Sequence, residues 1–540
     1  MSRTRPLLVT RARLWPEPEV RADAVLVEDG RIAAIGASDE LRLLAPHARV
    51  VNAAGATVTP GLCDAHLHFV PWAKARRQAD LRGAASLAEA LERVRAAIAA
   101  TPGDAPVVGR GWNADGWGEP PTRAALDAVS GGRVVLLHRH DFHTLWVNSA
   151  ALRVAGVGRD TPDPDGGRFD RAADGEPTGL VREHAVRAFA ALEAAAGPAV
   201  DAALLDDAAA ALHALGVTAV HDFQRDAVDF GRMRALAGRR RLRVLQMVDE
   251  SQTEWLALEG AASGSGDAWF RIGALKLFAD GTLGSRTAAL LEPWEDAPGT
   301  GMTLIEPAEL HRIVARAAAK GFACAVHAIG DAAVRHALDA FDACAAARAL
   351  AMPPRIEHVQ LLADADLGRF AALGVTASMQ PQHCTSDAAA ARAAWGARIA
   401  RSYPWRALLE SGARLAFGSD APVEPPFAAS GLAAAVERRA DGEGEAFVPG
   451  QAIALEHALA AYTSGARAAA GGWGVTRFVP GDEADLVVWD RDVFLTESGR
   501  LPDSRPAVTV LGGEIVYESL RTGAAADVAR SPVPNPGNGS

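Results

Sequence analysis

The sequence predicts an α/β protein: a closed barrel of eight parallel strands, a small sheet domain built from both ends of the chain, and a subdomain inserted after the first barrel strand. Two observations carry this prediction. Beyond residue 210 or so, short apolar segments alternate with helical stretches rich in Ala, Leu and Arg, as they do in parallel βα units. The two ends of the chain instead hold strand-like segments separated by Gly-containing turns, which are typical of β-meanders.

The terminal segments predict one sheet domain. An Asp-Gly turn at residues 29–30 separates the strand-like runs Ala24–Glu28 and Arg31–Gly36, which indicates a hairpin. A second meander near the other end has strands at 485–490, 508–511 and 514–517. We therefore expect residues 1–57 and 475–522 to pair in one domain. Residues 523–540 are rich in Pro, Gly, Ser and Asn and are expected to form a disordered tail.

Eight apolar segments, each ending in polar residues, predict the barrel within residues 58–474. The segments are Leu62–His68, Val217–Asp222, Arg243–Val248, Ile272–Phe278, Ala323–His327, Arg355–His358, Val375–Gln380 and Arg414–Asp420. The gap between the first two is too long for one helix, so residues 70 to about 210 are expected to form an inserted subdomain. It would have strands at 107–110 and 134–137, and a helix at 203–215 would lead back to the barrel.

Composition narrows the class of function. The 540 residues are 49% hydrophobic and carry a net charge of −11, and no basic face is evident, which argues against a nucleic-acid partner. No run of about 18 apolar residues exists, so we expect no membrane span. The four cysteines show no Cys-x-x-Cys spacing and are expected to be free thiols, and the N-terminus lacks a signal-peptide core. A cytoplasmic protein is the expectation.

Side chains that can bind a metal stand at the ends of the predicted strands. His66 and His68 are two residues apart after an apolar run, and residues i and i+2 of a strand point to the same side. Because the active site of such a barrel lies at the carboxyl ends of its strands, we expect the polar residues there to converge on one site. These residues are His66, His68, Lys276, His327, His358 and Asp420.

Lys276 is unusual in this chain. Of the 55 basic residues only three are lysines, and Lys276 alone follows an apolar strand segment. Arginine cannot lose its proton, whereas a lysine can when it is buried or near a metal. The choice of lysine at this position therefore favours a chemical role.

With these motifs the chain resembles the amidohydrolase superfamily, and within it the amidohydrolase-3 group of metal-dependent hydrolases that are similar to N-substituted formamide deformylases. The resemblance spans roughly residues 20 to 520. The motifs that carry it are Pro60-Gly61-Leu62 through His68, 276–281 with Gly284-Ser285-Arg286, 327–331, Glu357-His358 and Gly418-Ser419-Asp420. It implies a distorted (β/α)8 TIM barrel with a β-sandwich from both termini.

The resemblance also implies roles for the converging residues. His66, His68 and Asp420 would bind the more buried metal, and His327 and His358 the second. Lys276 would bridge the two as a carbamate. The donor set suits zinc, with iron, manganese and nickel as alternatives and either one or two ions. A homodimer is the expectation from the family.

Metal coordination lowers the pKa of water from 15.7 to about 7, and Asp420 can accept the water proton and pass it to a leaving nitrogen. We therefore expect hydrolysis of a C–N bond in an amide, a formamide or an N-acyl compound. The same site could act on an ester, a lactone or a carbamate. A non-catalytic scaffold would be expected to have lost ligands, and all six are present.

Further residues are candidates for binding a small-molecule substrate. Trp112, His143 and Trp146 belong to segments that resemble the inserted region of this family and are expected to line an aromatic pocket, although packing within the insert explains the tryptophans equally well. Arg286 is expected to meet an anionic group, with a surface salt bridge as the alternative. Gln380, at the end of the seventh barrel strand, is a further pocket candidate.

Overall fold

The computed structural model describes residues 5–519 except 102, 115, 140–143, 197–199, 440–443, 475–476 and 498, so the tail predicted at 523–540 lies outside the described residues. The chain divides into two compact units. One comprises Met1–His68 and Ala209–Ser540 and holds the barrel and the terminal sheets, and the other comprises the inserted segment Phe69–Ala208. A search of the described helices finds none with the length and apolarity that a bilayer crossing requires.

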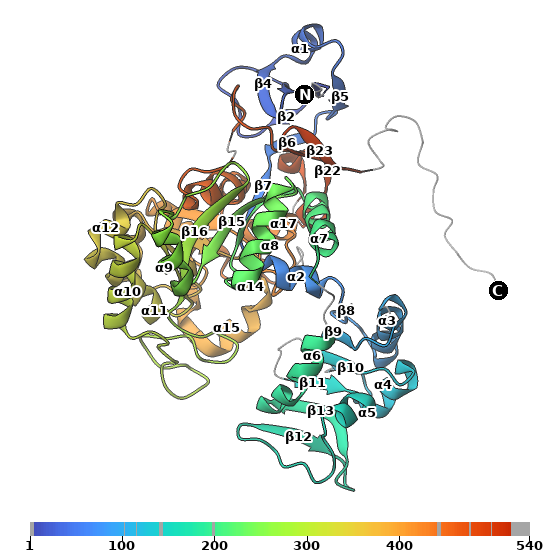
Figure 1. The fold of residues 1–540 in the computed structure, drawn as a ribbon. Coiled ribbons are helices and arrows are strands. Elements are labelled where there is room, and N and C mark those ends of the chain that lie inside the picture. The colour runs from blue at the N-terminus through green and yellow to red at the C-terminus, as the bar shows by residue number, and fades with distance from the viewer. Residues whose placement is uncertain are drawn as a thin grey trace, which may run out of the picture. The chain divides into compact units, whose positions relative to one another are not determined.

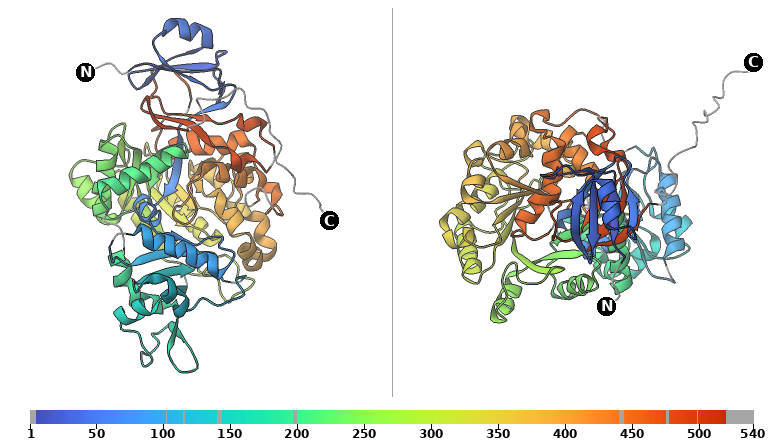
Figure 2. Two further views of the ribbon diagram at one scale, coloured as in Figure 1. Left: turned by 90° about the vertical axis from the view of Figure 1, so that its right-hand side faces the viewer. Right: turned by 90° about the horizontal axis from the view of Figure 1, so that it is seen from above.

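Eight parallel strands form the barrel, which confirms the predicted fold class (Figures 1 and 2). In chain order they are β7 (Leu62–Leu67), β14 (Val217–Asp222), β15 (Arg243–Val248), β16 (Phe270–Phe278), β17 (Cys324–Ala328), β18 (Arg355–His358), β19 (Thr376–Met379) and β20 (Arg414–Phe417). Each strand pairs with the next one along the chain. Every residue of β7, β15, β17, β18 and β19 is buried, as expected for strands covered on both faces.

The first and last strands meet at their carboxyl ends, where the barrel closes. The backbone N–H of Asp420 donates to the carbonyl of His66 at 2.6 Å, and that of His68 donates to the carbonyl of Ala421 at 2.8 Å. The buried carboxylate of Asp64 reinforces this seam, since it accepts hydrogen bonds from the Ser419 hydroxyl at 2.6 Å and from the Ser419 backbone N–H at 3.0 Å. The seam therefore fixes the position of Asp420 relative to the two histidines of the first strand.

Helices follow the barrel strands and cover their outer faces (Figure 1). In α10 the buried residues Leu310, Ile313, Val314 and Ala317 have the i, i+3, i+4, i+7 spacing of one helix face. The helices of this unit after the insert are α8 (Ala227–Gly238), α9 (Glu250–Leu258), α10 (Pro307–Ala319), α11 (Asp331–Ala343), α12 (Ala345–Arg348), α13 (Arg369–Leu373), α14 (Pro381–Ser386), α15 (Ala388–Trp395), α16 (Trp405–Glu410), α17 (Ala428–Glu437), α18 (Leu455–Ala460) and α19 (Ala466–Ala469).

Two further sheets come from the termini, as expected (Figure 1, blue and red segments). The first has the order β4-β3-β1-β5 and the second the order β2-β6-β21-β22-β23. Their strands are β1 (Leu7–Thr10), β2 (Arg13–Leu14), β3 (Ala24–Glu28), β4 (Arg31–Gly36), β5 (Arg49–Asn52), β6 (Thr57–Pro60), β21 (Leu486–Trp489), β22 (Pro506–Leu511) and β23 (Glu514–Glu518), and α1 (Ser38–Leu44) packs on the first sheet. Residues of both sheets, such as Val25 and Val488, share one hydrophobic core, so the two sheets pack face to face.

The inserted unit is a six-stranded sheet with helices. Its strand order is β12-β13-β11-β10-β9-β8. Its elements are α2 (Phe69–Ala75), β8 (Ala79–Asp80), α3 (Leu87–Ala100), β9 (Val107–Trp112), α4 (Arg123–Ser130), β10 (Val135–Arg139), β11 (Thr144–Val147), α5 (Ser149–Val154), β12 (Gly167–Arg171), β13 (Pro177–Glu183) and α6 (Ala190–Ala196). The strands expected at 107–110 and 134–137 are β9 and β10. Helix α7 (Ala202–Ala214) leads into β14, close to the helix expected at 203–215.

Candidate metal centre

The six residues predicted to bind metal stand at the carboxyl ends of β7, β16, β17, β18 and β20. Three of these residues each offer one potential ligand atom, and the three atoms lie within 4.8 Å of one another: they belong to His66, His358 and Asp420. This spacing can hold a metal ion. The Nε2 atoms of His66 and His68 are 3.5 and 3.4 Å from Oδ1 of Asp420. The ring centre of His327 lies 4.6 Å from that of His358. The strands thus bring together residues that are far apart in the sequence.

Hydrogen bonds fix which nitrogen of three histidines is left to bind a metal. Nδ1 of His66 lies 2.7 Å from the Glu357 carboxylate, and Nδ1 of His358 lies 2.8 Å from Oε1 of Gln380. Nε2 of His327 lies 3.0 Å from the carbonyl of Gly281. Each of these oxygens accepts, so the nitrogen that faces it carries the proton and donates. The lone pairs on Nε2 of His66, Nε2 of His358 and Nδ1 of His327 are therefore free for a cation.

Burial keeps these imidazoles neutral, the state in which they bind a metal. It lowers the pKa of His66 to about 4 against the opposing effect of Asp420, and it lowers the pKa of His327 to about 3 together with nearby Lys276. Burial and the neighbouring His327 hold the pKa of His358 well below its usual value. Neutral imidazoles and a carboxylate are the donors that suit zinc and related divalent ions, so the residues present fit a metal.

A buried ion pair between Arg355 and Glu357 holds His66 in its orientation. Burial opposes the negative charge of Glu357, but Arg355 and His66 outweigh it and hold the Glu357 pKa well below its usual value. The Arg355 guanidinium donates to Glu357 from Nε at 2.5 Å and from Nη2 at 3.1 Å, and to the Ser378 hydroxyl at 2.6 Å. Arg355 and Glu357 are both fully buried. Glu357 is therefore an ionised acceptor that fixes the orientation and tautomer of His66.

Lys276 lies among these groups, with its side chain 2% exposed. Its ammonium nitrogen is 4.8 Å from the ring centres of both Phe223 and Phe278. Burial lowers the pKa of Lys276 to about 8, against the opposing attraction of Glu357 and Asp420. A lysine in this buried environment releases its proton more easily than a lysine in water does.

The sequence analysis missed His383, which lies next to Asp420 on the short helix α14. Its Nε2 is 3.4 Å from Oδ2 of Asp420, and its Nδ1 is 3.8 Å from a carboxylate oxygen of Glu424. Burial opposes a charge on His383, but the hydrogen bonds to Asp420 and Glu424 outweigh it and raise the pKa to about 10. His383 therefore holds one oxygen of Asp420 while the other faces His66 and His68. The signal available was a histidine three residues after the predicted end of the seventh strand.

The residues expected to bind the substrate do not share one environment in the structure. Gln380 is buried and contacts His358, so it supports a candidate ligand. Arg286 forms a bidentate ion pair with Asp296, in which Nε donates to Oδ1 and Nη2 to Oδ2, and this favours the alternative of a salt bridge. Trp112 and Trp146 are 3% and 0% exposed in the core of the inserted unit, and their indole N–H groups donate to backbone carbonyls, which favours packing as their role. His143 lies outside the described residues.

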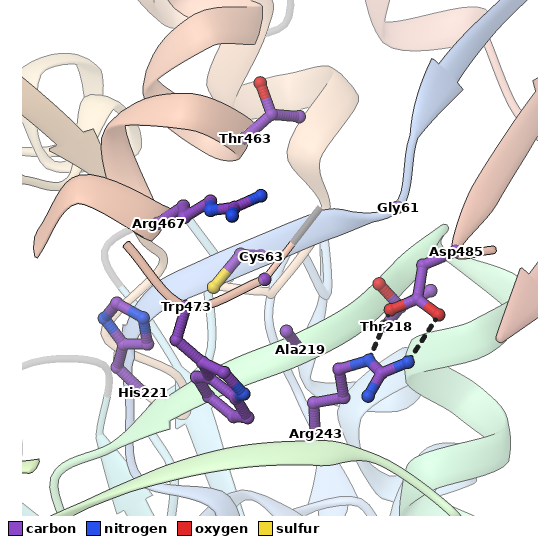
Figure 3. Close-up of a pocket in the computed structure, with 11 residues that line it drawn as sticks. Gly61, Cys63, Thr218, Ala219, His221, Arg243, Thr463, Arg467, Trp473 and Asp485 are labelled. Atoms are coloured by element: carbon purple, nitrogen blue, oxygen red, sulfur yellow. Dashed lines mark hydrogen bonds and ion pairs between the residues drawn. The ribbon is translucent and has the colours of Figure 1, made fainter. Parts of the chain in front are cut away.

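Among the described residues, the opposite end of the barrel holds no comparable cluster of metal-binding side chains. A cavity of about 20 Å³ lies at the amino ends of β7 and β14 and is lined by Gly61, Cys63 and Thr218, among others (Figure 3). It has room for about one water molecule, which is too little for a substrate. Beside it the buried Arg243 and Asp485 form a bidentate ion pair that joins β15 to the segment before β21. This end of the barrel serves stability, as is usual for the fold.

Comparisons with known proteins identify the family of this chain. A model of the amidohydrolase family matches residues 49–517. The chain belongs to the amidohydrolase family. A model of the imidazolonepropionase-like composite domain of bacteria matches residues 24–48.

This amidohydrolase is similar to other proteins along most of its length. The chain is 31% identical to the Bacillus subtilis protein YtcJ over 92% of its own length and 96% of that protein. It is 29% identical to the N-substituted formamide deformylase of Arthrobacter pascens over 93% and 96% of the two chains. An uncharacterised metal-dependent hydrolase from Pyrococcus horikoshii superposes with a TM-score of 0.73 at 27% identity, over 92% of this chain and 99% of that one. The match thus spans both units and is not confined to the barrel motifs.

Proposed function

We propose that this amidohydrolase cleaves a C–N bond of a small amide-like substrate with the help of a divalent metal held at the barrel mouth. The observation that carries the proposal is the convergence of His66, His358 and Asp420 within 4.8 Å, with the free lone pairs of both histidines set by hydrogen bonds on their other nitrogens. Family membership and the similarity to a formamide deformylase support hydrolysis as the reaction type.

His66, His68 and Asp420 would hold one ion, and His327 and His358 a second one if two are bound. When bound, the metal lowers the pKa of a water molecule and polarises the substrate carbonyl. We expect zinc from the imidazole and carboxylate donors.

In this proposal Asp420 moves the proton. Burial opposes its charge, but His66 and the hydrogen bonds with His383 and His68 outweigh it and hold the pKa of Asp420 well below its usual value. Asp420 is therefore ionised and can accept the proton of the attacking water on Oδ1, next to the candidate ligands. It then returns this proton to the leaving nitrogen, so that an amine departs and a carboxylic acid remains.

Lys276 would complete the site as a carbamate. Its neutral amine adds to carbon dioxide, forms an N–C bond and releases one proton, which leaves a carbamate whose two oxygens share one negative charge. An ammonium at this position would repel a dication, whereas a carbamate can bridge two ions. The lowered pKa of Lys276, about 8, favours the neutral amine that this step needs.

The test combines metal analysis with turnover of a substrate panel. The panel contains N-substituted formamides, other N-acyl compounds and matched esters. Asp420→Asn should keep much of the metal and lose at least about 100-fold in kcat, because general acid–base catalysis contributes about 10²–10⁴-fold. Asp339→Asn, which changes a half-exposed carboxylate on α11, should act like the wild type. Protein that binds no transition metal, or Asp420→Asn with full activity, would refute the proposal.

A further inference from the structure

We propose that Arg225 binds a carboxylate of the substrate, so that the preferred substrates are amides with an anionic group close to the scissile carbonyl. This inference rests on the proposed hydrolytic function and specifies its substrate class. It assigns the anion-binding role that the sequence suggested for Arg286 to a different arginine.

The backbone around Arg225 is anchored on both sides. Arg225 follows β14 at the end of the barrel that carries the candidate ligands. The carbonyl of Gln224 accepts a hydrogen bond from the buried Gln246 side chain at 2.6 Å. Asp226 caps α8, since its carboxylate accepts from the backbone N–H groups of Val228 at 2.8 Å and Asp229 at 3.1 Å. Arg225 is therefore presented from a fixed loop, which is what a specificity residue requires.

The guanidinium of Arg225 lies close to the metal-binding residues. It stacks over Phe278, the last residue of β16, at 4.9 Å from the ring centre. The same ring centre is 4.8 Å from the Lys276 nitrogen and 5.3 Å from the ring centre of His327. Phe278 thus lies near both Arg225 and the candidate ligands, and Arg225 is near enough for its charge to disfavour the charged form of Lys276.

No acidic side chain among the described residues pairs with Arg225. Within the described parts of the chain, the stacking on Phe278 is its one direct contact of a polar or aromatic kind, and no carboxylate pairs with it. Arg286 differs, because Asp296 accepts hydrogen bonds from both Nε and Nη2 of its guanidinium. Arg225 is partly exposed, and its N–H donors are open apart from the stacking on Phe278. In a protein of net charge −11, such an arginine is suited to bind an anionic group of the substrate.

The distances limit which anion fits. The two distances to the Phe278 ring centre place the Arg225 guanidinium within about 10 Å of the Lys276 nitrogen. A substrate whose anion lies one residue of extended chain, about 3.5 Å, from a carbonyl at the candidate ligands fits within this span. A carboxylate three or four bonds from the carbonyl carbon meets this condition. It can accept two parallel hydrogen bonds from the planar guanidinium, a geometry that a neutral amide cannot match.

The experiment compares N-formyl-L-phenylalanine with its carboxamide, which has the same size and no charge. The metal-loaded wild type should prefer the acid in kcat/KM, and Arg225→Gln should lower kcat/KM for the acid by about 10- to 100-fold, the range for loss of a hydrogen bond to a charged group. For the carboxamide the change should stay below about threefold. Arg225→Lys should keep part of the preference, and Arg286→Gln is the matched control that should leave it intact.

An equal loss of activity with both substrates would overturn the inference, because it would mean that Arg225 supports the metal centre and not the anion. No preference of the wild type for the acid would also overturn it. A binding measurement separates this inference from the proposed function. Calorimetric titration of N-formyl-L-phenylalanine should give a Kd at least tenfold weaker for Arg225→Gln than for the wild type, whether or not turnover follows. An unchanged Kd, or no binding to the wild type, would refute the role of Arg225.

Discussion

Replacing Glu357 by Gln tests whether a buried carboxylate sets the tautomer of His66. The two side chains have the same shape, but one end of the amide donates. One oxygen of Glu357 now lies 2.5 Å from Nε of Arg355, and the other lies 2.7 Å from Nδ1 of His66. In the variant, an N–H group replaces one of these two oxygens. If the amide N–H faces His66, Nδ1 must accept, the proton moves to Nε2, and the metal loses a ligand.

Two magnitudes follow from this geometry. Removing one partner of a buried ion pair costs about 3–5 kcal/mol, and we expect the lower end because the remaining amide oxygen can still accept from one donor. Loss of a group that orients a metal ligand lowers metal affinity by about 10- to 100-fold, which corresponds to roughly 1.4–2.8 kcal/mol.

The free energy of unfolding is measured by denaturant titration of the metal-free protein, and metal affinity by competition with a chelator. Glu309→Gln makes the same chemical change in a more exposed pair with Arg312 on α10 and should cost less than about 1 kcal/mol, with unchanged metal affinity. If Glu357→Gln matched the wild type in both measurements, Glu357 would have no role in orienting His66.

Three further changes test other parts of the structure. Lys276→Ala should lose at least about 100-fold in activity and regain part of it with added propionate, which supplies a carboxylate in place of the carbamate. Intact-mass analysis should find the mass of one carbon dioxide on the wild type and not on this variant. Full activity without propionate would contradict a carbamate. His383→Asn should lower kcat by about tenfold or more at nearly constant KM and metal content, because Asp420 loses the group that holds Oδ2; a steady-state assay in which only KM changed would argue against this role. Asp485→Asn should destabilise the protein by about 3 kcal/mol in thermal and chemical unfolding, because it leaves the buried Arg243 with the partly exposed Glu483 as its acidic partner, and a loss below 1 kcal/mol would show that the pair contributes little.

Much of the fold could be predicted because the barrel strands are local patterns. A run such as Cys324-Ala325-Val326-His327 is apolar, short and followed by a helical stretch, and its burial on both faces follows from that composition. The positions of His66, Lys276, His358 and Asp420 at strand ends follow from the same patterns.

The roles of the supporting residues could not be read from local patterns. His66 and Glu357 are 291 residues apart, and neither sequence segment indicates that they form a hydrogen bond. Gln380 was expected at the substrate, but its contact with His358 was not foreseen, and His383 was passed over although it contacts Asp420. Contacts of this kind depend on how the strands and the short helix α14 are packed.

The sequence by itself determined the barrel, the paired terminal sheets and the set of side chains offered at the strand ends, because hydrophobic periodicity and residue chemistry are local properties. Only the tertiary structure decided which nitrogen of each histidine is free, and which arginine keeps open donors. Arg286 is neutralised by Asp296, whereas Arg225 has a ring and no carboxylate beside it among the described residues. The physical reason is that charge pairing and hydrogen bonding depend on distances between segments far apart in the chain, and folding sets those distances.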